Sequence, residues 1–376
     1  MALMAGPRRL LGVLILVMIA IPGLSMPFQR ARIYSTAEYR KLAASPGWPQ
    51  TRAWASWPKS IDRYLGDHFA FREALVKAGN RTFGRVTASG APPSVLDGGH
   101  DRLFLFEGLL ASTGHEVDTD DARDYANFAC DLKGHLRATR ARLVVSIAPS
   151  PADIYPDDAP DLALPVFKPT NYDLIMAGLR ACGVSAVDLR PSLRAAKDLG
   201  QLYRRTDTHW TALGALIAYN QVVAAMGRPD FAIQPASVRW TSETRLDGDL
   251  PRCAGRVSIP ETVMSPDILQ LPESARRTTL SGFQAKLDPP SISSGESGPT
   301  VLIIGDSFTA LYFPPYFAHF VGRVVWMFQE DCRFDWNIVA SVKPDFVLLM
   351  PTERFARCPG GGRPINYVSQ PSGDSQ

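Results

Sequence analysis

The sequence predicts an α/β fold built on an open parallel β-sheet that is flanked by helices. Short, continuously apolar runs are typical of strands covered on both faces; they span residues 142–148, 184–189, 300–307, 322–328 and 345–351. Helix-like patterns lie between them, over residues 121–139, 171–182, 191–199, 211–226 and 308–320. Because strands and helices alternate along the chain, right-handed crossovers between parallel strands are expected.

Residues 1–32 are predicted to be a signal anchor or a signal peptide. Arg8 and Arg9 precede an uncharged stretch, residues 10–29, which is long enough to cross a bilayer, for which about 20 residues are needed. No clear small-residue cleavage site follows, so the sequence favours an uncleaved anchor. In either case the positive-inside rule places the rest of the chain outside the cytoplasm.

The charge balance argues against nucleic-acid binding. The chain has 40 Lys+Arg and 37 Asp+Glu, but four arginines and no acid lie in the first 32 residues. The remainder therefore carries 36 basic and 37 acidic side chains, a net charge of −1, and shows no cluster of Lys and Arg. A nucleic-acid-binding surface normally requires such a cluster.

The rest of the chain divides into a lead-in, a domain and a tail. Residues 33–90 are expected to be a helical lead-in, residues 91–358 the α/β domain and residues 359–376 a disordered tail. Within the domain, residues 231–299 are rich in proline and serine and have weak periodicity. We expect this segment to be an insertion or a lid.

The cysteines are compatible with an exported protein. Oxidising compartments permit one or two disulfides among the five cysteines, which are Cys130, Cys182, Cys253, Cys332 and Cys358. The connectivity does not follow from the sequence. No C-x-x-C pair or Cys/His cluster indicates zinc, and neither a metal nor a cofactor is expected.

A candidate nucleophile lies in the stretch VLIIGDSFTALYF, residues 301–313. An apolar strand leads into Gly305-Asp306-Ser307 and then into a helix-like segment, and ligands of open α/β sheets bind beyond the carboxyl ends of strands. The Ser307 hydroxyl would then face the binding crevice, and its backbone N–H could stabilise an oxyanion. The alternative is that Ser307 is simply a helix-capping serine.

The stretch TDTHW, residues 206–210, supplies a candidate base for that serine. His209 precedes a helix-like run, and Asp207, two residues earlier in a predicted extended segment, would share its face and fix its tautomer. Trp210 would point the other way, into the core or over a substrate ring. The alternatives are helix capping by Asp207 and His209, or metal binding, for which no further ligands appear at a recognisable spacing.

The order of these motifs resembles a known family. The segments are D-H-F-x-F-R-E (67–73), D-T-H-W-T-x-x-G-A (207–215), G-D-L (248–250), G-D-S-F (305–308) and E-R-F (353–355). Together they resemble the SGNH-hydrolase-like proteins of alginate O-acetylation, the AlgX/AlgJ family. Ordinary SGNH esterases carry the nucleophile first and D-x-x-H last, whereas here D-x-H comes first, in the circularly permuted order of that family.

The resemblance implies an activity and a place for it. Members of the family transfer acetyl groups to an exopolysaccharide in the bacterial periplasm, so Ser307 would be the nucleophile, His209 the base and Asp207 its orienting acid. A membrane-bound O-acyltransferase is the expected acetyl source, and the inner membrane would hold the N-terminal helix. The carbohydrate-binding module of AlgX is absent after the last predicted strand, which is closer to the anchored AlgJ-type architecture.

Two further functions and one further site stay open. A secreted carbohydrate acetylesterase would use the same triad, and a non-catalytic scaffold of a polysaccharide-modification complex would retain only the fold. Arg354 follows the last predicted strand, where its guanidinium could bind an anionic sugar, although a structural ion pair is the alternative.

Overall fold

The structure is a computed structural model that describes most of the chain after residue 93. Described are residues 34–35, 40–41, 43, 45–48, 54, 57–69, 72 and 94–358, the last range with gaps at 161–165, 284–286, 296, 330–331 and 333–334. The predicted anchor and the predicted tail lie outside these residues, as does much of the lead-in. Among the described residues, no helix has the length and apolar character that crossing a membrane requires.

The chain forms two compact units. The first contains Met1–Val95 and Asp249–Ser258, and the second contains Leu96–Gly248 and Ile259–Gln376. The first unit includes the antiparallel pair β1 (Tyr34–Ser35) and β2 (Arg40–Lys41) and the helices α2 (Trp57–His68) and α10 (Asp249–Cys253). The end of α2 is fixed by Asp67, whose carboxylate accepts the Ala43 backbone N–H at 2.7 Å.

A seven-stranded mixed sheet is the centre of the second unit. Its strand order is β6-β5-β13-β11-β12-β10-β9. The strands are β5 (Arg142–Ser146), β6 (Ser185–Val187), β9 (Arg276–Thr279), β10 (Pro290–Ser293), β11 (Thr300–Gly305), β12 (Arg323–Phe328) and β13 (Phe346–Met350). The last strand in the chain, β13, thus lies between β5 and β11.

The prediction of a parallel sheet is correct for five of these strands and incomplete for the edge. All pairs from β6 to β12 are parallel, whereas β10 pairs with β12, and β9 with β10, in the antiparallel sense. Both antiparallel strands come from residues 231–299. Their sequences, RRTT and PSIS, lack the continuous apolar run of a strand buried on both faces. β9 is exposed along its whole length, and only Ser291 and Ile292 of β10 are buried.

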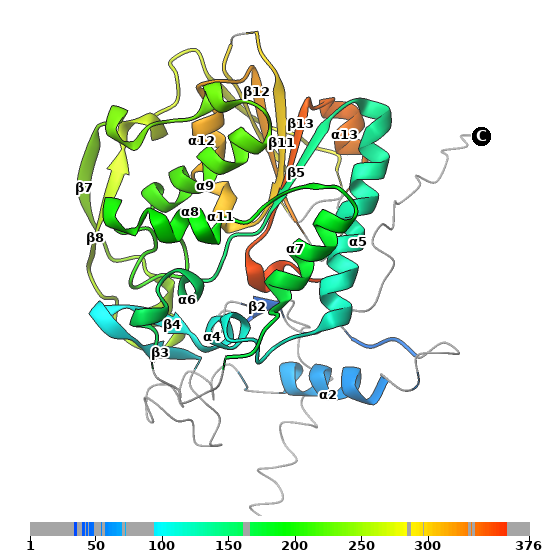
Figure 1. Cartoon of the computed structure of the whole chain (residues 1–376), viewed down its shortest axis with the longest axis vertical. Helices are drawn as coiled ribbons and strands as arrows, with labels where there is room; N and C mark the ends of the chain where they lie inside the picture. Colours follow the sequence, from blue (N-terminus) through cyan, green and yellow to red (C-terminus); the bar gives the residue numbers. More distant parts are fainter. Residues whose placement is uncertain are drawn as a thin grey trace, which may run out of the picture. The chain divides into compact units, whose positions relative to one another are not determined.

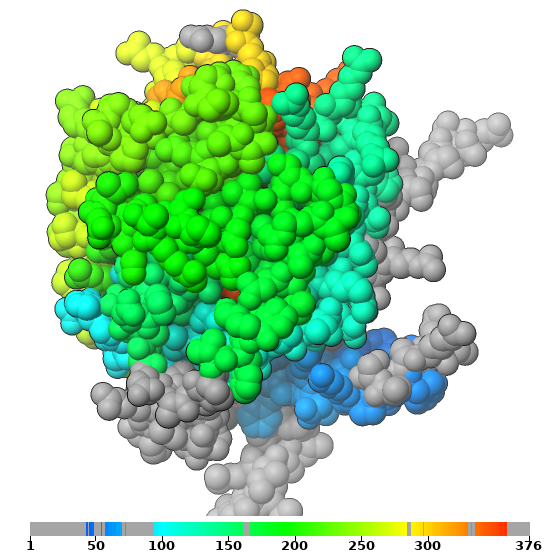
Figure 2. All heavy atoms as spheres, viewed as in Figure 1, coloured from blue at the N-terminus to red at the C-terminus, as the bar shows by residue number. Residues whose placement is uncertain are grey.

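Helices cover both faces of the sheet (Figure 1). One face carries α8 (Arg190–Ala195), α9 (Ala212–Ala225) and α12 (Phe313–Ala318), and the other carries α5 (Thr119–Leu136), α7 (Asn171–Ala181) and α13 (Asn337–Val342). Strand residues alternate between the two cores, so Ile303 packs with the first set and Ile304 with the second. In the space-filling view, the green segment with α7, α8 and α9 forms much of the face toward the viewer (Figure 2).

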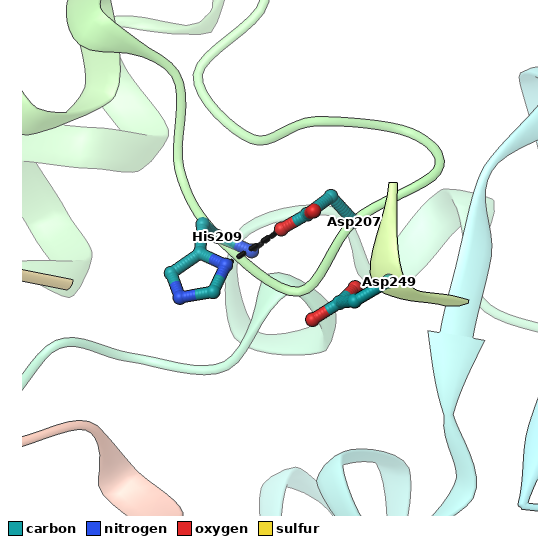
Figure 3. Close-up of side chains that lie close together, drawn as sticks. All are labelled: Asp207, His209 and Asp249. Atoms are coloured by element: carbon teal, nitrogen blue, oxygen red, sulfur yellow. Dashed lines mark hydrogen bonds and ion pairs between the residues drawn. The ribbon is translucent and has the colours of Figure 1, made fainter. Parts of the chain in front are cut away.

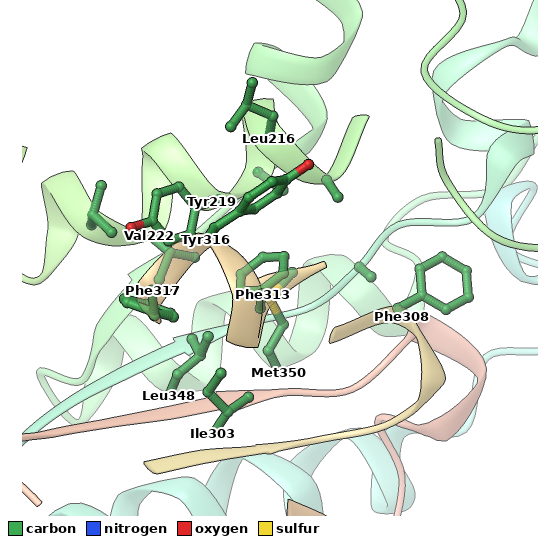
Figure 4. Packing of buried hydrophobic residues seen from close by; sticks show 14 of the residues in the cluster. Leu216, Tyr219, Val222, Ile303, Phe308, Phe313, Tyr316, Phe317, Leu348 and Met350 are labelled. Atoms are coloured by element: carbon green, nitrogen blue, oxygen red, sulfur yellow. The ribbon is translucent and has the colours of Figure 1, made fainter. Parts of the chain in front are cut away.

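The core beside α9 is rich in aromatic side chains. Tyr219 of α9 makes edge-on contacts with Tyr316 and Phe317 of α12, above Ile303 and Leu348 of the sheet (Figure 4). All five of these side chains are fully buried. This packing fixes α9, and therefore the loop that precedes it, against the sheet, whose strand β11 ends just before Ser307.

The remaining elements of the second unit are short. They are β3 (Val95–Asp97), whose first residue belongs to the first unit, β4 (Leu103–Leu105), α4 (Phe106–Ser112), α6 (Pro151–Ile154), β7 (Trp240–Arg245), β8 (Glu261–Pro266) and α11 (Ser307–Ala310). β7 and β8 pair in the antiparallel sense, with Arg245 opposite Glu261. Disulfides join Cys130 to Cys182 and Cys332 to Cys358, as the expectation of one or two bridges allows; Cys253 is buried outside both.

Candidate active site

Ser307 lies at the turn between β11 and α11, as the sequence predicts. Asp306 is the N-cap of α11, and its carboxylate accepts the Phe308 backbone N–H at 3.0 Å and the Thr352 backbone N–H at 2.6 Å. The second bond ties the turn to the chain that leaves β13. A side chain at Gly305 would place its Cβ 2.8 Å from the Met350 carbonyl oxygen, so the close approach of these strand ends requires glycine here.

His209 and Asp207 are positioned at this turn by hydrogen bonds. His209 Nε2 lies 2.8 Å from the Ser307 hydroxyl, and His209 Nδ1 lies 2.6 Å from Asp207 Oδ1. Figure 3 shows the Asp207–His209 interaction; Asp249, also drawn there, is part of the first compact unit. When Nδ1 carries the proton that Asp207 accepts, Nε2 is free to accept the proton of Ser307. The arrangement is that of a nucleophile, a base and an orienting acid.

The loop that carries the pair is bent rather than extended, contrary to the prediction. Asp207 Oδ1 accepts the backbone N–H of His209 at 2.9 Å, and Arg204 donates its backbone N–H to the His209 carbonyl at 3.0 Å. The short aspartate side chain therefore caps its own turn, a local option that competes with extended structure. The predicted helix does follow, with Thr211 as the N-cap of α9.

The pKa of Asp207 is lower than that of an ordinary aspartate. Burial alone would raise it, but the hydrogen bonds and the charge of His209, together with the charge of Arg204, more than offset burial. Asp207 therefore stays ionised near neutral pH, as an acid that orients and stabilises an imidazolium must.

Trp210 and Arg354, the two predicted substrate-binding residues, differ in burial. The Trp210 ring is fully buried; its indole N–H donates to the Phe308 carbonyl at 2.9 Å, and it stacks on Phe313. It therefore takes the core position, one of its two expected places. Arg354 is half-buried, and within the described residues its Nε has no hydrogen-bond partner.

Two charged residues near the loop were not predicted from the sequence. Arg204 forms an ion pair with Asp207, and Glu261, at the start of β8, accepts hydrogen bonds from the loop. Arg204 could have been suspected from its spacing, three residues before Asp207. Glu261 gave no signal, because more than fifty residues separate it from the groups that it contacts.

The chain is similar in sequence to one family of known proteins. The profile of the family described as "SGNH hydrolase-like domain, acetyltransferase AlgX" matches residues 95–339. The chain is 29% identical over 175 residues to "Probable alginate O-acetylase AlgJ" of Pseudomonas syringae pv. tomato, covering 46% of this chain and 43% of the relative. With the protein of the same name from Pseudomonas aeruginosa it shares 28% identity over 228 residues, 58% of this chain and 56% of the relative.

The chain spans about half the length of these curated relatives. Among solved structures, the "O-Acetyltransferase Domain of Pseudomonas putida AlgJ" superposes with a TM-score of 0.43 at 18% identity, covering 70% of this chain and 92% of that one. Since the family profile matches more than half of the 376 residues, the chain belongs to the SGNH hydrolase-like family of the acetyltransferase AlgX.

Proposed function

We propose that the protein is an O-acetyltransferase that moves acetyl groups onto hydroxyls of an exported bacterial exopolysaccharide, alginate or a similar polymer. The observation that carries the proposal is the continuous hydrogen-bonded series Asp207–His209–Ser307 at the carboxyl end of a central strand. Because the chain belongs to an acetyltransferase family, we assign acetyl transfer to this geometry. The names of the relatives indicate that the acceptor is a polysaccharide such as alginate.

The reaction would proceed in two half-reactions through an acetyl-serine. His209 takes the proton of Ser307 as the serine oxygen attacks the acetyl carbonyl, and the resulting imidazolium returns that proton to the leaving group. A sugar hydroxyl then attacks the acetyl-serine, with His209 again accepting and returning the proton. The backbone N–H of Ser307 is the donor that we assign to the oxyanion.

A carbohydrate acetylesterase is the second candidate. The His209–Ser307 hydrogen bond lies in an exposed position, and the His209 side chain is 31% accessible, so water can approach the acetyl-serine. For transfer to dominate, the acceptor sugar must exclude that water when it binds. Closure by residues 231–299 is one way to do so. A non-catalytic scaffold has less support, because it would not need the proton-transfer geometry.

The remaining assignments complete the proposal. The protein would work in the periplasm, held at the inner membrane by residues 1–32, with a membrane-bound O-acyltransferase as its acetyl source. Arg354 would meet the carboxylate of an acidic sugar. The burial of Trp210 favours a role in packing beneath the site over direct stacking with a sugar ring.

The test uses the full-length protein with a chromogenic acetyl ester, in the presence and absence of an acidic oligosaccharide. We expect acetyl on Ser307 by mass spectrometry, acetylated sugar when the acceptor is present, and loss of about 10³-fold or more in turnover for Ser307→Ala and His209→Ala. Free acetate as the sole product would indicate the esterase. Folded wild type without any acetyl-serine would favour the scaffold.

A further inference from the structure

Glu261 is a buried carboxylate that binds the loop before His209. Its two oxygens accept the backbone N–H of Arg205, the backbone N–H of Thr206 at 3.2 Å, the Thr206 hydroxyl at 2.7 Å and the Gln201 side-chain amide at 2.6 Å. The side chain is only 4% exposed. These four donors come from a stretch of six residues that ends immediately before Asp207.

Arg204 links this carboxylate to the catalytic acid. Its Nη1 lies 3.4 Å from Asp207 Oδ2, its Nη2 lies 2.8 Å from Asp247 Oδ1, and its Nε lies 3.4 Å from Glu261 Oε2. The last contact is an ion pair without the angle of a hydrogen bond. One planar guanidinium therefore faces three carboxylates, a geometry that the point charge of a lysine cannot reproduce.

Arg102, which precedes the loop in the sequence whereas Glu261 follows it, binds the carbonyl groups of the same loop. This buried guanidinium donates to the carbonyl oxygens of Tyr203 at 3.2 Å and Arg204 at 3.1 Å, and Leu103 donates its N–H to the Arg205 carbonyl at 2.8 Å. Arg102 is in turn paired with Asp158 at 3.1 Å. The N–H groups of Arg205 and Thr206 thus bind a buried carboxylate, and the carbonyls of Tyr203 and Arg204 bind a buried guanidinium, each from a distant segment.

We propose that Glu261 and Arg204 are positioning residues for the acetyl transfer, which hold Asp207 where it orients His209 toward Ser307. The inference rests on the proposed function. It gives residues 231–299 a task that a lid does not perform: they supply the carboxylate that organises the catalytic loop. Misplacing a reacting group by about 1 Å can reduce a rate by about 10²-fold, and loss of a buried acceptor leaves the loop donors unsatisfied.

The decisive variant is Glu261→Gln, with Glu243→Gln as its matched control. Glu243 lies on β7, the partner strand of β8, and its half-exposed carboxylate pairs with Arg245. In the Glu261→Gln variant, the new side-chain amide would turn a donor toward donors of the loop. We expect kcat for the chromogenic ester to fall by about tenfold or more with KM within about twofold, whereas Glu243→Gln behaves as wild type.

A second readout separates positioning from folding. A serine-directed sulfonyl fluoride labels Ser307 at a rate that depends on activation of the hydroxyl. For Glu261→Gln we expect this rate, measured on the folded fraction, to fall together with kcat. A normal labelling rate with fewer labelled molecules would show that Glu261 serves stability alone, and would overturn the inference.

Arg204 provides an independent test should Glu261→Gln fail to fold. Arg204→Gln should lower kcat more than Arg204→Lys does, and Arg245→Gln, which removes a guanidinium that contacts Asp247 at 3.7 Å, should leave kcat unchanged. Equal activity of all three variants would refute the role of Arg204. If Ser307→Ala is as active as wild type, the proposed function fails instead, so the two failures are distinguishable.

Discussion

Replacing Asp207 by asparagine would test the catalytic geometry most directly. In the native loop Asp207 Oδ1 faces two donors of His209, and Oδ2 faces the guanidinium of Arg204 at 3.4 Å. An amide has one acceptor oxygen and one donor nitrogen. Whichever way it is rotated, its –NH₂ group must therefore face a donor, and the negative charge that favours an imidazolium is lost.

The expected loss follows from these contacts. A hydrogen bond to a charged group contributes about 1.5–3 kcal/mol. When the –NH₂ group faces Nδ1, the imidazole carries its proton on Nε2 and cannot accept the proton of Ser307. Together these effects correspond to about 4–5 kcal/mol in the barrier, or roughly 10³–10⁴-fold in kcat. The aspartate-to-asparagine change in serine proteases has an effect of about 10⁴-fold.

The assay is the initial rate of acetyl-ester cleavage by the full-length protein, with Asp198→Asn, at an exposed position, as the control. The Asp207→Asn variant should keep its circular dichroism spectrum and a KM near that of wild type, because the acid does not bind substrate. If a folded variant lost less than about tenfold in kcat, Asp207 would not be the acid that orients His209.

Three further predictions concern stability and the nucleophile turn. Burial would raise the pKa of Asp158, but hydrogen bonds from His100 and Arg102 hold it low. The ionised Asp158 carboxylate therefore stabilises the folded protein fully above the unfolded pKa of about 4, and this contribution is lost as pH falls. In urea unfolding, Asp158→Asn should lower the free energy of unfolding at about pH 7 and change it little near about pH 2. Removing the disulfide between Cys130 and Cys182, which closes a separation of 52 residues, should cost about 2–4 kcal/mol in thermal and urea unfolding under oxidising conditions; an unchanged Tm would contradict this. Gly305→Ala should destabilise by about 1–3 kcal/mol and slow acetylation of Ser307; full activity would show that the strand ends can move apart.

The sequence predicts the parallel centre of the fold and the location of the candidate catalytic side chains for the same physical reason. Strands such as β11 and β13 are buried on both faces, so they need continuous apolar runs, and the residues that follow them must lie at one edge of the sheet. Edge strand β9 is polar and exposed. Its pairing depends on β10 rather than on its own composition, so no local pattern could reveal it.

The loop with Asp207 and His209 has features that no local sequence pattern predicts. The pairing of Asp207 with His209 follows from their spacing, but the bend does not, because the aspartate bonds to the His209 backbone as well as to its ring. The long-range partner Glu261 is invisible to any window of sequence. A buried acid opposite loop N–H groups can be identified only once the fold has brought the two segments together.

The place of β13 in the sheet has a consequence for biosynthesis. This strand is the last of the seven to be synthesised, yet it fills the gap between β5 and β11. Until it arrives, two apolar strand edges have no partner, and the turn that carries Ser307 lacks its bond from Thr352. A chain that stops before β13 would thus expose both open edges, through which unpaired strands aggregate. The candidate site therefore assembles only after β13 has been synthesised, later than all six other strands of the sheet.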